Sequence, residues 1–227
     1  MNLRPVRHLA VATLYFNKTL WQFERNLQRM IAHAGKHSTV DNVTLLTRDG
    51  VAVDMARQAI VEHALDENCD AVVWLDTDML YPDHAITRLV QMSNDGHMIA
   101  AGLYRRARPP YQILTTLHDM DTYAELDEIK AQATDGVTSV VITAGGFSIV
   151  RNELYHAIAQ QVGPPWYCNF DFRSGHAMCG EDRFFLYRAH ECGVYPVVDP
   201  DLHALHWPPM TGPVPVLQND PLLVHTQ

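Results

Sequence analysis

The sequence has little cysteine and no long hydrophobic run. Four of its 227 residues are cysteine, and no two of them form a Cys-x-x-Cys pair, so we do not expect a disulfide framework. Every apolar run is shorter than the ~18 residues that cross a bilayer, so we expect no membrane span. The apolar run at residues 9–16 lacks a small-residue cleavage site after it. It predicts a buried strand rather than a secretory signal, and hence a cytoplasmic protein.

Positive charge is also scarce. The chain has 17 Lys and Arg against 26 Asp and Glu, a net charge of -9. This balance gives no general electrostatic attraction to DNA or to anionic lipid. One local basic cluster, at Arg105, Arg106 and Arg108, leaves a contact with nucleic acid open.

A zinc site is a weak alternative. His176 and Cys179 have the spacing of two zinc ligands, and Cys168 precedes them. A structural zinc site needs a second pair of ligands, which the sequence does not supply.

The order of predicted elements indicates an α/β fold. Strands are expected at residues 8–14, 43–46, 71–75 and 98–103, with helices between them at 19–34, 53–65 and 82–92. Alternation of this kind predicts a mostly parallel central sheet flanked by helices. A smaller mixed C-terminal part follows, with strands at 137–142, 147–150 and 195–198 and helices at 152–162 and 181–192. We expect one domain over residues 1–207 and a proline-rich extended tail over 208–227.

Two carboxylates follow the third predicted strand. Asp76 and Asp78 come directly after the apolar run 72–75, and alternate residues of an extended chain project to the same side. Open α/β sheets bind ligands at the carboxyl ends of their strands, and paired carboxylates are ligands for a hard divalent cation. The alternative is that Asp78 only caps the next helix.

The same pair permits a second chemistry. An apolar strand followed by Asp-x-Asp also begins the phosphatases of haloacid dehalogenase type, in which the first acid is the nucleophile. That motif normally lies on the first strand and carries Thr or Val where this chain has Leu80. Only Lys130 follows Asp78 as a candidate lysine partner, so we rank this phosphohydrolase second.

Residues 72–79, VVWLDTDM, resemble the DxD motif of GT-A glycosyltransferases, particularly those similar to glycosyltransferase family 2. Four other segments match in the family's order: 56–58 (ARQ, where the family usually has ARN), 102–110, 145–151 (GGFSIVR) and 180–185 (GEDRFF). Asp199-Pro200 and then His206 match a late segment in which a histidine often completes the metal site. The resemblance spans residues 8–207 and implies a GT-A, Rossmann-like fold.

The resemblance also implies a reaction and a cofactor. A Mn²⁺ or Mg²⁺ ion would be held by Asp76, Asp78 and His206, with His203 close enough in sequence to be confused with His206. The substrate would be a nucleoside-diphosphate sugar, with a UDP-sugar expected. The cation would stabilise the departing diphosphate as a Lewis acid.

The resemblance assigns further residues to the donor and the acceptor. Donor-binding candidates are Thr13, Tyr15, Arg57, Asp76, Thr77, Asp78, Arg105 and Arg106. Asp182 is the candidate general base and Glu181 a second catalytic acid, although acids at a helix start are also stabilised by its dipole. Gly145, Gly146 and Trp166 are acceptor-side candidates, with core packing as the alternative for Trp166.

The acceptor is the least defined part. Small stand-alone enzymes of this kind are similar to bacteriophage proteins, some of which modify hydroxymethylated pyrimidines in DNA; such a protein would act in the host cytoplasm. A base extruded from DNA needs a pocket and phosphate contacts. The arginine cluster at 105–108 is the candidate for the phosphate contacts, whereas the net charge of -9 argues against DNA. A non-catalytic nucleotide- or glycan-binding module is the third hypothesis.

Overall fold

The computed structural model describes residues 3–15, 21–106, 110–169 and 180–206. The expected tail at 208–227 lies outside these ranges, as do Arg108 and the proposed zinc ligands His176 and Cys179. Within the described ranges, no helix has the length and hydropathy needed to cross a membrane.

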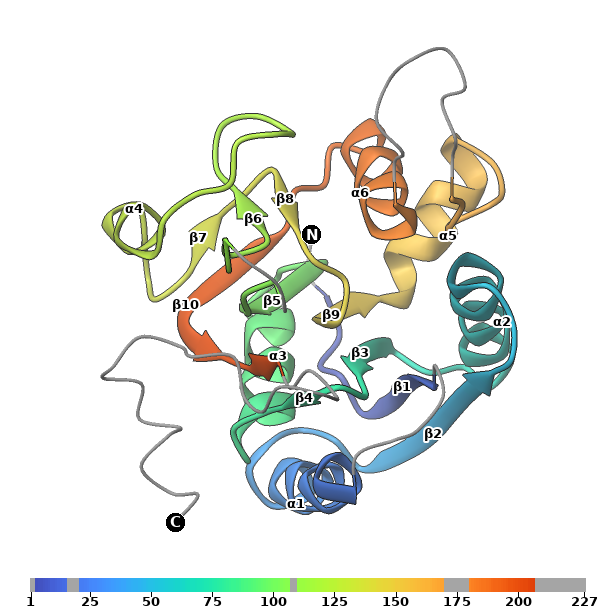
Figure 1. Ribbon diagram of the computed structural model, residues 1–227. Helices are drawn as coiled ribbons and strands as arrows, with labels where there is room; N and C mark the ends of the chain where they lie inside the picture. The colour runs from blue at the N-terminus through green and yellow to red at the C-terminus, as the bar shows by residue number, and fades with distance from the viewer. Residues whose placement is uncertain (1–2, 16–20, 107–109, 170–179, 207–227) are drawn as a thin grey trace.

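The described chain alternates strands and helices (Figure 1). The helices are α1 (Trp21–His37), α2 (Val53–Asp66), α3 (Ala85–Asn94), α4 (Leu126–Ala131), α5 (Asn152–Gln161) and α6 (Glu181–Glu191). The strands are β1 (His8–Tyr15), β2 (Asn42–Asp49), β3 (Ala71–Asp76), β4 (Met79–Leu80), β5 (Ile99–Leu103), β6 (Thr115–Thr116), β7 (Thr138–Ser139), β8 (Ile142–Thr143), β9 (Phe147–Arg151), β10 (Val197–His203) and β11 (Leu205–His206).

The main sheet has seven strands in the order β2-β1-β3-β9-β5-β10-β7. Strands β2, β1, β3, β5 and β10 run in one direction, which confirms the expected mostly parallel sheet. Strand β9 runs antiparallel between β3 and β5, and β7 runs antiparallel to β10. The fourth predicted strand, β5, therefore does not neighbour β3, and the mixed second half of the chain forms part of the same sheet.

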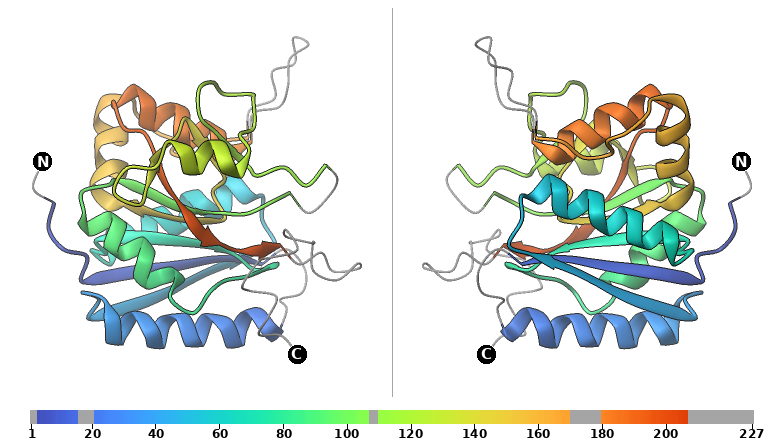
Figure 2. Two further views of the ribbon diagram at one scale, coloured as in Figure 1. Left: turned by 90° about the vertical axis from the view of Figure 1, so that its left-hand side faces the viewer. Right: turned by 90° about the vertical axis from the view of Figure 1, so that its right-hand side faces the viewer.

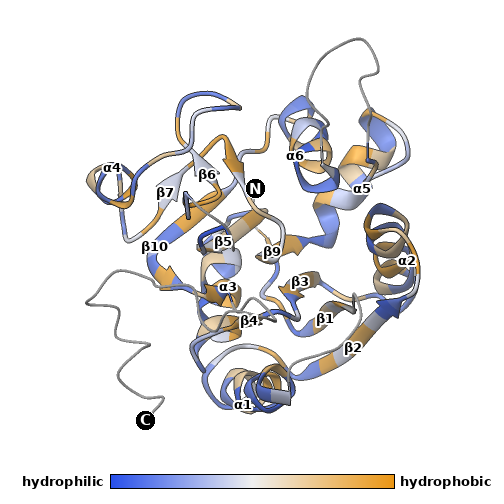
Figure 3. Cartoon of the chain, in the orientation of Figure 1, coloured by the Kyte–Doolittle hydropathy of each residue, from blue (hydrophilic) through white to orange (hydrophobic). Residues whose placement is uncertain are grey.

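Helices cover both faces of the sheet (Figure 2). Val73 and Leu75 of β3 point to the side of α1 and α3, while Val72 and Trp74 point to the side of α2, α5 and α6. This alternation explains why β3 is almost wholly apolar, since a strand buried on both faces has no solvent side. The edge strand β2 is mixed in hydropathy instead (Figure 3).

The chain after Asp76 turns and forms a short antiparallel pair. Strand β4 pairs with β11, so that His206 lies opposite Met79. Helix α3 begins only at Ala85, with His84 as its N-cap residue and no side-chain cap, so Asp78 is not the cap of this helix. The pairing of β4 with β11 brings the end of the described chain to the carboxyl end of β3.

Candidate active site

The turn after β3 is anchored from three elements. Thr77 Oγ1 donates to the Leu14 carbonyl at 3.0 Å, which ties the turn to β1. The buried Asn26 side chain both donates to the Tyr81 carbonyl and accepts from its N–H, each at 2.8 Å. Tyr81 Oη lies 2.9 Å from the carbonyl oxygens of Asp76 and Gly146. The backbone that carries both aspartates is therefore held in place by α1, by β1 and by Gly146, the residue before β9.

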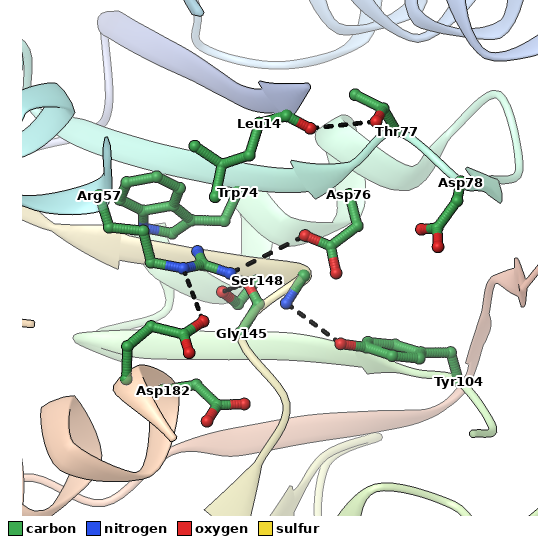
Figure 4. A network of polar contacts seen from close by, with 12 residues as sticks. Leu14, Arg57, Trp74, Asp76, Thr77, Asp78, Tyr104, Gly145, Ser148 and Asp182 are labelled. Atoms are coloured by element: carbon green, nitrogen blue, oxygen red, sulfur yellow. Dashed lines mark hydrogen bonds and ion pairs between the residues drawn. The ribbon is translucent and has the colours of Figure 1, made fainter. Parts of the chain in front are cut away.

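Arg57 forms the centre of a buried ionic network (Figure 4). Its Nη2 lies 3.8 Å from Asp76 Oδ1 and its Nε 3.2 Å from Glu181 Oε1. The guanidinium lies 4.7 Å from the centroid of the Trp74 ring and 5.7 Å from that of Tyr167, within range of cation–π attraction. Arg57 thus joins α2, the end of β3 and the start of α6.

This burial changes where Arg57 can act. The side chain is only 4% exposed, whereas we expected Arg57 to touch the nucleotide or its phosphates. The structure places it behind Asp76 and Glu181 instead, where it positions two carboxylates.

The carboxylates of the network have raised pKa values. Burial raises the pKa of Asp76 to about 6, against the lowering effect of Arg57, and the charge of Asp78 adds to the rise. Burial also raises the pKa of Glu181, again opposed by Arg57. Desolvation therefore outweighs the ion pairs, and both acids are poor places for an uncompensated negative charge.

His206 and Asp78 face each other across the pair of β4 with β11. His206 Nε2 lies 3.0 Å from Asp78 Oδ2, and Nδ1 lies 3.1 Å from the Arg105 carbonyl, to which it donates. Burial lowers the pKa of His206, but the hydrogen bond and charge of Asp78 outweigh it and raise the pKa above 6.5. His203 instead contacts the Pro200 carbonyl at 2.6 Å, so the structure selects His206 as the histidine of this site.

Gly146 lies directly against the Asp76 carboxylate. A Cβ atom at this position would lie 1.9 Å from Asp76 Oδ2, so only glycine leaves the carboxylate where it is. The Gly146 N–H donates to Tyr104 Oη at 3.2 Å. This bond connects Gly146 to the residue that follows β5. At Gly145 the nearest atom would be the Asp182 Cβ at 3.2 Å, so the two glycines bring β9 against both proposed acids.

For the nucleotide-sugar activity that the sequence resemblance implies, we expect a Gly146→Ala variant to lose about 100-fold in kcat/KM, measured as hydrolysis of a UDP-sugar by water, because the added methyl group displaces the Asp76 carboxylate. Gly35→Ala is the matched control, since a Cβ there meets nothing within 4 Å. Measured UDP release should separate the two variants. Equal rates would show that the position of Asp76 does not matter.

A cleft of about 400 Å³ lies beside Asp182. Its lining includes Arg106, Arg183 and Tyr123, together with Ala144 and Asp182. Asp182 follows Glu181 at the start of α6, yet Arg57 bonds to Glu181, while the Asp182 Oδ1 accepts the neighbouring Arg183 N–H, at 2.7 Å. The two adjacent acids are therefore divided between the buried network and the cleft.

The chain is similar to known proteins in its structure, and no similarity was found by sequence. No protein-family model matches the sequence, and no curated protein sequence does. The crystal structure of A197 from STIV matches with a TM-score of 0.56 and 15% identity, over 89% of this chain and 86% of that one. The crystal structure of GalNAc-T7 with UDP, GalNAc and Mn²⁺ matches with a TM-score of 0.58 and 12% identity, over 88% of this chain.

The chain has a GT-A-like glycosyltransferase fold. It spans 43% of the GalNAc-T7 chain, so the match covers less than half of that protein. The predicted fold class is thereby confirmed.

Within the GT-A-like fold, the remaining predicted residues divide into those at the site and those in the core. Thr13 is buried on β1, and its Oγ1 has no hydrogen-bond partner among the described residues. Tyr15 ends β1, paired through its backbone with Asp49. Trp166 is packed in the core, donating from Nε1 to the Tyr155 carbonyl at 2.8 Å. Trp166 therefore does not present its ring to a substrate.

The two described arginines of the cluster, Arg105 and Arg106, have different surroundings. The Arg105 Nη1 donates to the Tyr111 carbonyl at 3.0 Å, so this side chain supports the loop, and its own carbonyl orients His206. Arg106 is exposed and lines the cleft.

Several residues of the site were not assigned from sequence. Tyr81 and Asn26 carry no motif, and an isolated Tyr or Asn gives no signal of its role. Tyr104 and Arg183 lie inside the matched segments 102–110 and 180–185, so the resemblance contained them without giving them a function. Lys130, the candidate lysine of the phosphohydrolase alternative, lies on α4 and forms an exposed ion pair with Asp201 at 2.8 Å.

The raised pKa of Asp76 predicts a pH-dependent stability in chelator. The folded protein binds this proton with a pKa of about 6 against an ordinary 3.8, so ionising Asp76 lowers the free energy of unfolding as pH rises through that window. Urea unfolding of the wild type and of Asp76→Asn should be compared across the window. The stability of the wild type relative to the variant is expected to fall with rising pH, and a constant difference would contradict the prediction.

Proposed function

We propose that this chain is a metal-dependent glycosyltransferase that moves a sugar from a UDP-sugar to an acceptor hydroxyl. The observation that carries the proposal is the contact between Asp78 and His206, made by the pairing of β4 with β11 at the carboxyl end of β3. It lies in a GT-A-like fold, and a solved structure with a similar fold contains UDP, GalNAc and Mn²⁺.

The donor atoms at this place suit Mn²⁺ or Mg²⁺. Nδ1 of His206 donates to the Arg105 carbonyl, and Nε2 faces Asp78 at 3.0 Å, so Nε2 is the nitrogen that would bind a cation once the proton it shares with Asp78 is lost. Imidazole and carboxylate together suit a first-row divalent ion such as Mn²⁺. Among the described residues, no three His, Cys, Asp or Glu side chains are grouped to hold a metal ion by themselves. Diphosphate oxygens of the donor would therefore complete the coordination, with Asp76 beside them.

The metal, when bound, supplies Lewis-acid stabilisation of the leaving diphosphate. The protein's own part is positioning and proton transfer. The acceptor oxygen attacks the anomeric carbon, the bond from that carbon to the diphosphate oxygen breaks, and Asp182 takes the proton of the acceptor hydroxyl. Glu181 and Asp76 both contact Arg57, and this shared contact holds the start of α6 near the end of β3.

Nucleotide contacts belong to the same proposal. Thr77 holds the turn through Leu14, and Tyr15 ends β1 next to it. These residues lie at the carboxyl ends of parallel strands, where an open α/β sheet binds its ligand.

A hydroxymethylated pyrimidine in phage DNA remains our proposed acceptor from the sequence analysis. Its support in the described structure is Arg106, which lines the cleft next to Asp182. A direct test is transfer of labelled sugar to an oligonucleotide containing 5-hydroxymethylcytosine, with the unmodified cytosine oligonucleotide as the control. Transfer to neither oligonucleotide would remove DNA as the acceptor.

The enzyme proposal is tested by thermal stabilisation with nucleoside diphosphates in Mn²⁺, Mg²⁺ or chelator. A ligand that binds only the folded state contributes about 2.7 kcal/mol at 100 times its Kd. We expect stabilisation by UDP with a cation and none in chelator. A folded protein that no nucleotide stabilises in the presence of cation would contradict the proposal.

A further inference from the structure

The cleft beside Asp182 contains two arginines and one carboxylate. Arg106 and Arg183 line it from the segment after β5 and from the first turn of α6. The cleft lining carries two positive charges against the one negative charge of Asp182, whereas the chain as a whole has a net charge of -9. An excess of positive charge that the protein does not neutralise attracts an anionic ligand.

Arg183 is held in place but only weakly neutralised. Its side chain is 27% exposed, and its Nη1 lies 3.4 Å from Asp121 Oδ1, on a side chain that is itself 90% exposed. An ion pair with so exposed a partner contributes little and competes poorly with a ligand. The guanidinium lies 6.0 Å from the Tyr123 ring centroid, and Nη2 is 3.5 Å from Tyr123 Oη. Tyr123 therefore orients the arginine and leaves its charge available.

Within the described ranges, the hydrogen bond that Arg106 makes comes from its backbone. Its N–H donates to the Gln112 carbonyl at 2.9 Å. Its guanidinium has no hydrogen bond or ion pair with any described residue, and the residue is exposed. A guanidinium offers five N–H donors in a planar fork that matches phosphate oxygens.

We propose that this cleft binds a phosphate group of the acceptor through Arg106 and Arg183, so that the acceptor is a phosphate-bearing compound with a free hydroxyl. The proposal rests on the proposed glycosyltransferase function. Asp182 repels phosphate, so the phosphate lies on the arginine side and the hydroxyl on the side of Asp182. The cleft volume of about 400 Å³ exceeds that of a lone phosphate and falls in the range of small-molecule sites.

The phosphate site is tested with inorganic phosphate as the probe. With UDP and Mg²⁺ present to fill the donor site, phosphate is added and the Nε–Hε signals of the arginines are followed by NMR. We expect the Arg106 and Arg183 signals to shift, and each of Arg106→Gln and Arg183→Gln to weaken phosphate binding about 10-fold or more. Arg29 serves as the internal control, because it is an exposed arginine on α1 that is paired with Asp83.

Three results would overturn the proposal: no shift at either arginine, equal shifts at Arg29, or phosphate that only displaces UDP. UDP affinity is measured in Arg183→Gln, and we expect it to stay at the wild-type value. If UDP fails to bind the wild type at all, the glycosyltransferase function fails, whereas loss of phosphate binding with UDP binding intact removes only the acceptor proposal.

Turnover then separates the two sources of phosphate. Glucose 6-phosphate against glucose tests a phosphomonoester, and the hydroxymethylated oligonucleotide against its free nucleoside tests a phosphodiester. In one of the two pairs, we expect sugar transfer to the phosphate-bearing acceptor to be faster than transfer to the acceptor without phosphate. We expect this difference in rate to disappear in Arg183→Gln. Equal rates within both pairs would contradict a phosphate subsite.

Discussion

An Asp78→Asn variant is expected to release UDP from a UDP-sugar about 10²–10³-fold more slowly than the wild type, at saturating cation. The carboxylate lies 3.0 Å from His206 Nε2, and an amide at the same place offers a cation a weaker, neutral oxygen. The side chain is 49% exposed, so the free energy of unfolding should change by less than about 1 kcal/mol. The expected loss is thus in function and not in folding.

Steady-state kinetics with Mn²⁺, together with urea unfolding, measure both quantities. Asp41→Asn is the control, because Asp41 is an exposed acid whose partner, Arg7, lies outside the site. Its rate should equal that of the wild type. If Asp78→Asn were as active as Asp41→Asn, the cation would have to bind elsewhere.

The second large effect concerns stability. An Arg57→Met variant is expected to lose about 2–3 kcal/mol in its free energy of unfolding, because removal of the buried cation leaves two partly buried carboxylates uncompensated. The charges are those of Asp76 and Glu181, whose raised pKa values already reflect their desolvation. Methionine keeps most of the side-chain volume between Trp74 and Tyr167, so the lost cation dominates the effect.

Urea unfolding in chelator measures this change. Arg25→Met, at an exposed position on α1, should stay within about 0.5 kcal/mol of the wild type. Adding Asp76→Asn and Glu181→Gln to Arg57→Met should recover much of the loss, since no buried charge then lacks a partner. A triple variant no more stable than Arg57→Met would show that packing, and not charge, is what Arg57 contributes.

Much of the fold was predictable because its longer elements carry clear patterns. The helices expected at 53–65, 152–162 and 181–192 end within one residue of α2, α5 and α6. The strand expected at 137–142 is instead divided into β7 and β8, which are too short to show a hydrophobic period. The direction of β9 was not predictable, because an apolar run gives the same pattern for either direction of a strand.

The types of residue at the site were predictable from the sequence, but the contacts and the burial of each residue were not. Asp76 and Asp78 follow the strand expected at 71–75, and His206 was selected through the resemblance. The pairing of β4 with β11 that joins Asp78 to His206 involves strands of two residues, for which sequence gives no signal. A lone arginine on a helix usually lies in solvent, so nothing in the sequence distinguished the buried Arg57 from the exposed Arg106.

The antiparallel insertion of β9 also affects how the chain can be divided. Strands β3 and β5 precede β9 along the chain, yet each pairs with β9 and not with the other. A polypeptide that ends before Phe147 would leave both apolar strands with an unpaired edge, which is a template for aggregation. The part of the chain before Phe147 is therefore not separable as an independent folding unit. During synthesis the inner edges of β3 and β5 stay open until the ribosome has delivered residues 147–151.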